Sequence, residues 1–162
     1  MERQRERNLA FDRFYQAERA GLLRTVTFTL DDRDLAADVT DEAFARAYER
    51  WDDVGAMTNS VGWVYRVAVN LARNRQWRRF LEKRRPLPAD VEPVGIDGVA
   101  DPAIARALTQ LPLDQRSVVV LRFHLDWSVE QVATALDIAP GTVKSRLHRA
   151  LQRLEQLLEE RS

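Results

Sequence analysis

Apolar residues recur at steps of three and four along most of the chain, a periodicity that predicts amphipathic helices. No sustained alternation of apolar and polar residues, which would indicate strands, interrupts this pattern. Polar segments separate the first helices: Asp34 or a neighbour can cap the second, and Asn59 or Ser60 the third. We therefore expect an all-α fold, with helices in the first half at about residues 9–30, 35–51 and 61–83.

The composition changes after the third predicted helix. Residues 84–102 hold four prolines and two glycines, which is typical of a flexible linker rather than a packed element. Helical patterns then resume, at about residues 102–110, 111–125, 129–136 and from 140 onward. The sequence thus predicts two small helical domains, residues 1–85 and 102–162, joined by an acidic, Pro-rich linker at 86–101.

The last two predicted helices form a helix-turn-helix pattern. Ser128 and Gln131 have the spacing of a capping box, in which each side chain accepts a hydrogen bond from the other residue's backbone N–H. Pro140 suits the first position of the last helix, whereas Ala139 is a poor N-cap, which we expect to weaken this helix start by about 1 kcal/mol.

The last helix has two distinct faces on a helical wheel. Its apolar stripe consists of Val143, Leu147, Ala150 and Leu154. The opposite side carries Ser145, His148, Arg149 and Gln152, with Thr142 beside them and Lys144 and Arg146 at the flanks. Such a face suits a helix that reads the DNA major groove, with central polar groups at base edges and cations at phosphates. A surface helix that contacts only water has the same pattern, but the preceding capped helix and short turn favour DNA.

Charges are segregated along a chain that is formally neutral. Residues 31–53 contain nine acidic residues and three arginines, whereas residues 66–85 contain eight basic residues and one acid. Solvated helix faces alone can produce single runs of this kind. Alternating acidic and basic blocks indicate separate surfaces for separate partners.

Several classes of protein are disfavoured by what the sequence contains. There is no cysteine and there are two histidines, so we expect neither a metal site nor a cofactor. No apolar run is long enough for a bilayer span, and the amino-terminal segment is not of the secretory type, which favours a cytoplasmic protein without membrane insertion. No nucleotide-binding loop or paired-carboxylate site supports an enzyme.

The third predicted helix mixes aromatic residues with arginines, a composition that suits single-stranded nucleic acid because aromatics stack on bases. A small domain also needs aromatic residues in its core, so we expect Tyr65 and Phe80 to be buried. We expect Trp63, near the helix start, to be exposed for an opened strand. Asn70 can either hydrogen-bond within the core or read a base edge.

Two blocks together resemble a known family. The segments "LPLDQRSVVVLR", "WSVEQVATALDIAP" and "GTVKSRLHRALQRL" resemble region 4 of bacterial sigma factors. The segments "DVTDEAFARAYERW" and "GWVYRVAVNLARNR" resemble region 2. Their order and spacing are similar to the extracytoplasmic-function (ECF, group 4) sigma factors of the sigma-70 family, which keep only these two domains. The resemblance implies a promoter-specificity subunit of RNA polymerase that recognises the −35 and −10 elements and assists promoter opening.

The resemblance also implies roles for individual residues. The residues that it implies bind core polymerase are Asp38, Asp41, Glu42, Phe44, Arg46 and Trp51. The residues that it implies recognise and melt the −10 element are Trp63, Arg66, Asn70 and Arg73, with the loop at 55–59 nearby. The residues that it implies recognise the −35 element are Thr142, Lys144, Ser145, Arg146, His148 and Arg149. Asp41 stands where the family often has Gln, which affects the details of the docking contact.

The partners implied are the β′ coiled coil and the β subunit of core polymerase, and promoter DNA, as duplex at −35 and single strand at −10. The resemblance also implies an anti-sigma factor as a possible partner. It further implies a cytoplasmic protein that is associated with the bacterial nucleoid when it is part of holoenzyme. Two alternatives remain from the residues alone: a free-standing helix-turn-helix regulator, and a helical interaction protein such as an adaptor. The first predicts tight duplex binding without polymerase, and the second no dependence on polymerase at all.

Overall fold

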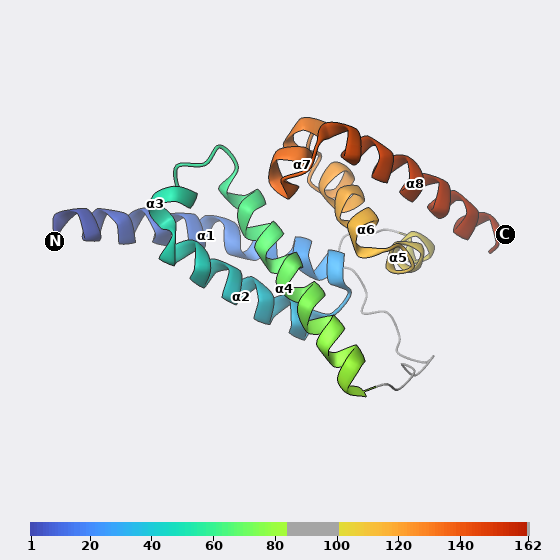
Figure 1. Ribbon diagram of the computed structural model, residues 1–162, viewed down its shortest axis with the longest axis horizontal. Helices are drawn as coiled ribbons and strands as arrows, with labels where there is room; N and C mark the ends of the chain where they lie inside the picture. The colour runs from blue at the N-terminus through green and yellow to red at the C-terminus, as the bar shows by residue number, and fades with distance from the viewer. Residues whose placement is uncertain (84–100, 162) are drawn as a thin grey trace.

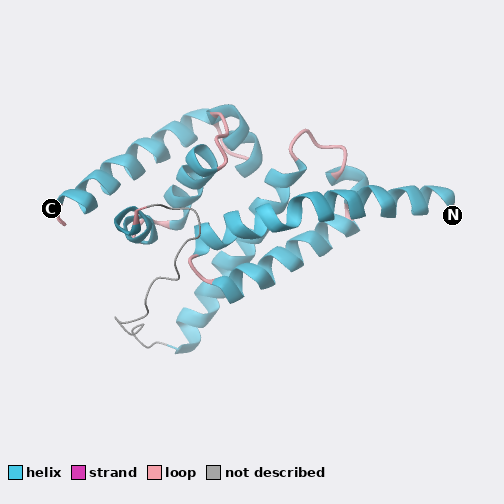
Figure 2. Cartoon of the chain, turned by 180° about the vertical axis from the view of Figure 1, so that it is seen from behind, coloured by secondary structure: helices cyan, strands magenta, loops and turns pink. Residues whose placement is uncertain are grey.

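The computed structural model describes residues 1–83 and 101–161, and its side chains over 1–75 and 101–161. Every regular element in this part of the chain is a helix, as predicted (Figures 1 and 2). The elements are α1 (Glu2–Leu30), α2 (Arg33–Glu49), α3 (Trp51–Val54), α4 (Ser60–Lys83), α5 (Pro102–Thr109), α6 (Leu113–Val119), a π-helical turn η1 (Val120–His124), α7 (Val129–Leu136) and α8 (Pro140–Glu159). Most of the predicted linker, and the side chain of Phe80, lie outside the described residues.

The three helix starts for which the sequence predicts a side-chain cap all carry one. The Asp32 carboxylate accepts from the Leu35 N–H (3.0 Å) at the start of α2, and the Asn59 side-chain oxygen accepts from the Gly62 N–H (2.9 Å) at the start of α4. Asp101 caps α5 in the same way, 2.8 Å from the Ala103 nitrogen. These bonds satisfy backbone donors that the first turn leaves unpaired.

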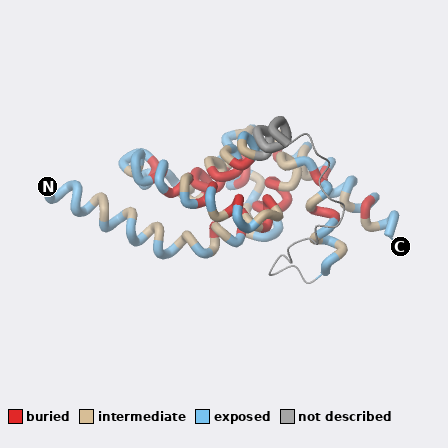
Figure 3. Tube along the Cα trace, turned by 90° about the horizontal axis from the view of Figure 1, so that it is seen from below, coloured by how far each residue is buried: buried red, intermediate tan, exposed pale blue. Residues whose placement is uncertain are grey.

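Some boundaries differ from prediction. Helix α1 begins at Glu2 rather than near residue 9, and its extra turns project beyond the other helices (Figure 3). Arg7 holds these turns in place, because its guanidinium pairs with Asp52 (3.2 Å) and donates to the Tyr48 carbonyl. The π turn was not predicted; in it the Leu125 N–H bonds to the Val120 carbonyl (3.3 Å) five residues back.

The N-terminal module (α1–α4) and the C-terminal module (α5–α8) pack on one another and share a core. The largest apolar cluster joins Val26, Val39 and Val64 of the first module to Val118 and Val132 of the second, all fully buried. Each such side chain contributes about 1.5–3 kcal/mol through burial. A second cluster packs Phe28 at the end of α1 against the C-terminal module. The shared core therefore fixes where the predicted site residues lie relative to one another.

Candidate nucleic-acid and polymerase interfaces

The predicted −35 residues lie on one solvent-facing side of α8, which runs along the outer edge of the molecule (Figure 1). Val143 and Ala150 are fully buried, and Leu147 and Leu154 are half-buried, so the predicted apolar stripe faces the core. The exposed positions are Lys144, Ser145, His148 and Arg149, while Thr142 and Arg146 are half-buried. The Ser145 hydroxyl donates to the Gly141 carbonyl (2.9 Å), which leaves its oxygen lone pairs free to accept.

Helix α7 and the turn after it set the position of α8. Both hydrogen bonds of the capping box are present: Ser128 N–H to Gln131 Oε1 (2.8 Å) and Gln131 N–H to Ser128 Oγ (3.1 Å). Asp137 then takes a left-handed conformation (φ 54°) that ends α7, and Pro140 begins α8 behind an uncapped Ala139, as predicted. The pair of helices thus has the predicted helix-turn-helix arrangement.

The predicted −10 residues lie on α4, where the C-terminal module packs against part of the helix: Arg66 is half-buried, whereas Asn70 and Arg73 are exposed. Trp63 is 8% exposed, which corrects the expectation that it is open to a single strand. Trp63 belongs to the main apolar cluster. Beside it, α7 packs against the start of α4 so closely that a methyl group added at Gly62 would lie 2.7 Å from the Ala135 Cβ. Tyr65 is fully buried, as predicted, and Asn70 is exposed, so its amide is not a core group.

The two arginines on this face are paired with acids of the other module. The Arg66 guanidinium lies 3.5 Å from the Asp137 carboxylate, and Arg73 pairs with Asp114. These partners could not be predicted from the sequence, because each acid lies at a polar helix end that resembles an ordinary cap or turn. The two acids neutralise arginines that the sequence analysis predicts to bind DNA.

The predicted docking helix α2 exposes an acidic face. Asp38 and Asp41 are exposed; Asp41 pairs with Arg19 (3.1 Å), while Asp38 has no ion-pair partner within the described residues. Glu42 pairs with Arg46 one turn on (3.2 Å). The hydrogen bond that Arg19 donates to the Asp41 carboxylate is the main cause that raises the pKa of Arg19. Such exposed pairs contribute little stability, about 0–1 kcal/mol each, so they leave the face available to a partner.

Two aromatic residues of the predicted docking set serve the interior instead. Phe44 is 2% exposed, which corrects its assignment as a surface contact: it lies on the face of α2 that packs on α1, with ring centroids 5.0 Å from Tyr15 and 5.8 Å from Phe14. Trp51 is half-buried and packs on Phe11 (5.3 Å) and Phe14 (5.0 Å). Helix α2 thus offers charge outward and aromatic surface inward.

A buried polar network at the junction of the modules was missed by sequence reasoning. Arg116 of α6 donates to the Thr29 carbonyl of α1 (2.7 Å) and to the carbonyls of Thr109 (2.8 Å) and Leu111 (2.9 Å). The Thr29 hydroxyl lies 2.8 Å from the Tyr65 hydroxyl. No local signal could have identified this network, because Arg116 and Thr29 are 87 positions apart.

Burial shifts the pKa of several groups in and near this junction. Burial lowers the pKa of Arg116, opposed by the nearby Asp31 carboxylate, and raises that of Tyr65 to about 12. Burial also raises the pKa of Asp31, against the effect of Arg116. His124 stacks on Phe28 (centroids 5.0 Å apart), and burial together with Arg24 lowers its pKa. Burial therefore favours the uncharged form of His124, whereas Arg116 is held by three carbonyls through its terminal nitrogens, and its Nε has no hydrogen-bond partner within the described residues.

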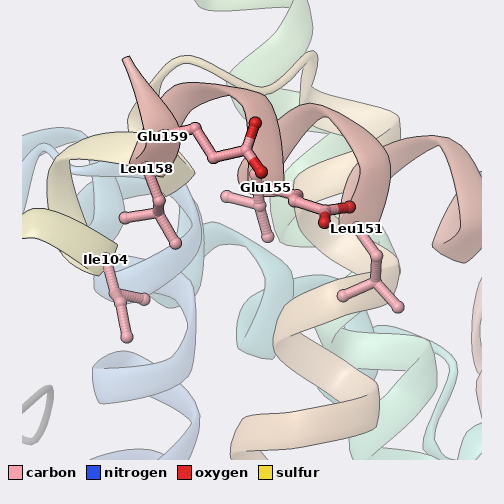
Figure 4. A pocket seen from close by; sticks show the side chains of 6 residues that line it. Ile104, Leu151, Glu155, Leu158 and Glu159 are labelled. Atoms are coloured by element: carbon pink, nitrogen blue, oxygen red, sulfur yellow. The ribbon is translucent and has the colours of Figure 1, made fainter. Parts of the chain in front are cut away.

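Two hollows line the C-terminal module. A cavity of about 150 Å³ lies between the modules and is bordered by Arg66, Asn70 and Arg73 of α4 and by Asp114, Ser117 and Arg146. An apolar groove of about 500 Å³ lies between α5 and the end of α8, where Ile104, Leu151 and Leu158 are accompanied by Glu155 and Glu159 (Figure 4). Within the described residues, no cluster of His, Cys, Asp and Glu could hold a metal ion, and no helix is long and apolar enough to cross a bilayer.

Comparison with known proteins gives consistent matches. A family model described as "Sigma-70, region 4" matches residues 102–154. The RNA polymerase sigma-E factor of Streptomyces avermitilis is 35% identical over 159 residues, covering 94% of this chain and 87% of the relative. The ECF RNA polymerase sigma factor SigL of Mycobacterium tuberculosis is 32% identical over 154 residues, covering 90% of this chain and 87% of the relative.

Solved structures share the fold. The sigma factor RpoE in complex with the anti-sigma factor NepR, from Bartonella quintana, has a TM-score of 0.72 at 23% identity, covering 92% of this chain and 96% of that one. CnrH in complex with the cytosolic domain of CnrY has a TM-score of 0.65 at 21% identity, covering 94% and 89%. The sequence matches extend over both helical modules. This chain belongs to the extracytoplasmic-function group of the sigma-70 family of RNA polymerase sigma factors, whose role is that of a specificity subunit in transcription initiation.

Proposed function

We infer that this sigma factor uses three separate surfaces: α8 for the −35 element, α4 for the −10 element, and α2 for core polymerase. The observation that carries the proposal is the exposed polar face of α8, which follows a capped helix and a short turn. The protein contributes recognition and strand capture, and has no catalytic activity of its own. It acts in the cytoplasm, on promoter DNA of the nucleoid.

At the −35 element, α8 lies in the major groove of duplex DNA. Arg149 is exposed near the middle of the polar face, where its planar guanidinium can donate two hydrogen bonds to one guanine. Ser145 and His148 reach neighbouring base edges, and Lys144 and Arg146 lie at the flanks, where phosphates pass. Thr142 contributes at the amino-terminal end of the helix.

At the −10 element, α4 holds bases of the opened non-template strand. Asn70 offers both a donor and an acceptor to a base edge, and Arg66 and Arg73 pair with phosphates. Trp63, 8% exposed, supports this face from within the core. Base capture offsets the few kcal/mol needed to unstack the strand, which couples recognition to opening.

On core polymerase, the acidic face of α2 binds the β′ coiled coil, and the C-terminal module approaches β. Asp38, Asp41 and Glu42 attract a basic partner surface and steer its approach. Arg46 and Trp51 border this face. An anti-sigma factor is a further partner, because two solved structures of the same fold are complexes of sigma factors with proteins that bind them, NepR and CnrY.

Two substitutions separate promoter reading from polymerase docking. Arg149→Ala removes a base contact, which should cost roughly 1–3 kcal/mol of binding free energy at the −35 element. We therefore expect −35-dependent transcription to fall by about 5- to 150-fold, while the variant still co-purifies with core polymerase as the wild type does. Asp38→Arg reverses an unpaired charge on α2 and should reduce co-purification. Arg161→Ala and Asp12→Arg are matched controls on exposed residues outside these surfaces. Equal loss of polymerase binding in both test variants, or in neither, would refute the division of roles.

A further inference from the structure

The small cavity between the two modules carries a surplus of positive charge. Three arginines border it, Arg66 and Arg73 of α4 and Arg146 of α8, whereas Asp114 is the one acid among the described residues that border it. Three guanidinium groups against one carboxylate leave two positive charges in excess. Asp137 pairs with Arg66 at 3.5 Å, but it does not border the cavity and its side chain is 86% exposed, so water screens much of its charge. The cavity therefore attracts an anion.

Hydrogen-bond donors at this cavity lack acceptors. Within the part of the chain that the structure describes, Arg66 has its ion pair with Asp137 but no hydrogen bond, and Arg146 has neither an ion pair nor a hydrogen bond. The side-chain amide of Asn70 likewise makes no hydrogen bond to the described residues. A guanidinium group carries five N–H donors and an amide two. Both arginines are half-buried, so an acceptor within the cavity would satisfy donors that the protein leaves unpaired.

The volume of the cavity limits the size of the ligand. It measures about 150 Å³, which is below the range of about 300–1,000 Å³ that is usual for pockets that hold drug-sized molecules. A nucleoside does not fit such a space, whereas an inorganic ion does. The ligand that this cavity suits is therefore a small anion.

The chemistry of the donors favours an anion of the phosphate type. The planar fork of a guanidinium group matches two oxygens of a phosphate, and such charge-assisted bonds are stronger than those between neutral groups. A phosphate group carries about −1.5 to −2 charges near neutral pH, which balances the surplus of two positive charges. Asp114 does not counter this attraction, because its carboxylate is paired with Arg73.

We propose that this cavity is a binding site for a small oxyanion of the phosphate type, held by Arg66 and Asn70 of α4 and by Arg146 of α8. The site does not depend on the roles proposed above for these helices in promoter binding. Its ligating groups come from both modules, so a bound anion bridges α4 and α8. By mass action, it stabilises the folded protein as its concentration rises above the dissociation constant.

Titration of the full chain with inorganic phosphate tests the proposal. Isothermal titration calorimetry at constant ionic strength should show one saturable site per chain, for which sulfate, also a tetrahedral dianion, competes. Arg66→Gln and Arg146→Gln should each weaken phosphate binding about tenfold or more, because each removes a charged donor. Arg149→Gln is the matched control: it removes the same group from an exposed position of α8 that does not border the cavity, and it should bind as wild type does.

A second variant and a direct readout separate loss of the site from damage to the fold. Asn70 is exposed, so Asn70→Ala removes a neutral donor without disturbing the core, and it should weaken phosphate binding several-fold. In NMR spectra of the wild-type protein, the side-chain Nε–H signals of Arg66 and Arg146 should shift on addition of phosphate, while that of Arg149 should not. Phosphate should also raise the thermal midpoint of wild type and of Arg149→Gln, but not that of Arg146→Gln.

Three results would overturn the proposal: no saturable binding of phosphate, an equal loss of affinity in Arg149→Gln, or shifts of similar size at all arginines, which indicate general screening of charge. A site for a nucleic-acid strand gives a different result. In that case, a short random-sequence single strand binds and Arg66→Gln weakens its binding, while inorganic phosphate neither binds nor competes. That outcome would contradict the anion site and leave the proposed role of α4 in place.

Discussion

Phe44 illustrates how a single side chain can be assigned to the wrong surface. Sequence resemblance placed it with the charged residues of the docking helix, and it is indeed on the same helix, α2. The helical period turns it inward, where it is 2% exposed and packs on Phe14 and Tyr15. Residue type was informative, since a phenylalanine on a helix that also carries charged residues usually faces a core.

Truncating Phe44 should therefore damage stability rather than a specific contact. We expect Phe44→Ala to lower the free energy of unfolding by about 3–5 kcal/mol, because it removes a buried ring and leaves a cavity. Urea denaturation followed by circular dichroism measures this, and Phe44→Leu should lose clearly less. A Phe44→Ala protein of wild-type stability that fails to bind polymerase would restore the surface assignment.

At the scale of elements, local signals predicted most helix starts and the helix-turn-helix. Caps are local events, so Asp32, Asn59 and the Ser128–Gln131 box could be found from a few neighbouring residues. The amino-terminal turns of α1 were missed because they depend on Arg7 reaching the segment around Tyr48 and Asp52. The π turn was missed because its hydrogen bonds leave no mark in the apolar periodicity.

The start of α8 offers a test of local reasoning. Ala139 is the N-cap and has no side chain to accept a hydrogen bond from the first turn. Ala139→Ser should stabilise the protein by about 0.5–2 kcal/mol, since serine can accept such a bond. The urea midpoint should rise, and Ala139→Gly should give a somewhat smaller rise, since glycine is poorer than serine as an N-cap by only a few tenths of a kcal/mol. No stabilisation by serine would mean that the first turn of α8 is already satisfied by water.

At the scale of the whole molecule, the sequence predicted two modules but not their contact. The decisive interactions join residues 62–73 to residues 114–137, and each surface alone reads as an ordinary amphipathic helix. Trp63 is buried in the core that both modules share, and the wheel of a single helix does not show this, which is why its exposure was wrongly predicted. The exposed face of α8 was predictable, because it follows from the helical period of a single helix and from the position of that helix's apolar residues.

The arrangement also explains how a neutral chain can serve three charged partners. Acidic residues of α2 face outward toward the proposed polymerase surface, while basic residues are divided between α4 and α8. The acids that pair with α4 come from the C-terminal module, so neutrality is partly an internal pairing of charges between the two modules. Net charge alone conceals this division.

The central claim, promoter selection by this sigma factor through α8 and α4, is tested most directly by one measurement. Purified core RNA polymerase is incubated with the protein and genomic DNA fragments, and the transcript starts are mapped by run-off transcription. We predict discrete starts that share one upstream sequence pair, require the protein, and are weakened selectively by Arg149→Ala at the −35 position. Starts identical to those of core polymerase alone, or unchanged by the protein's presence, would contradict the account.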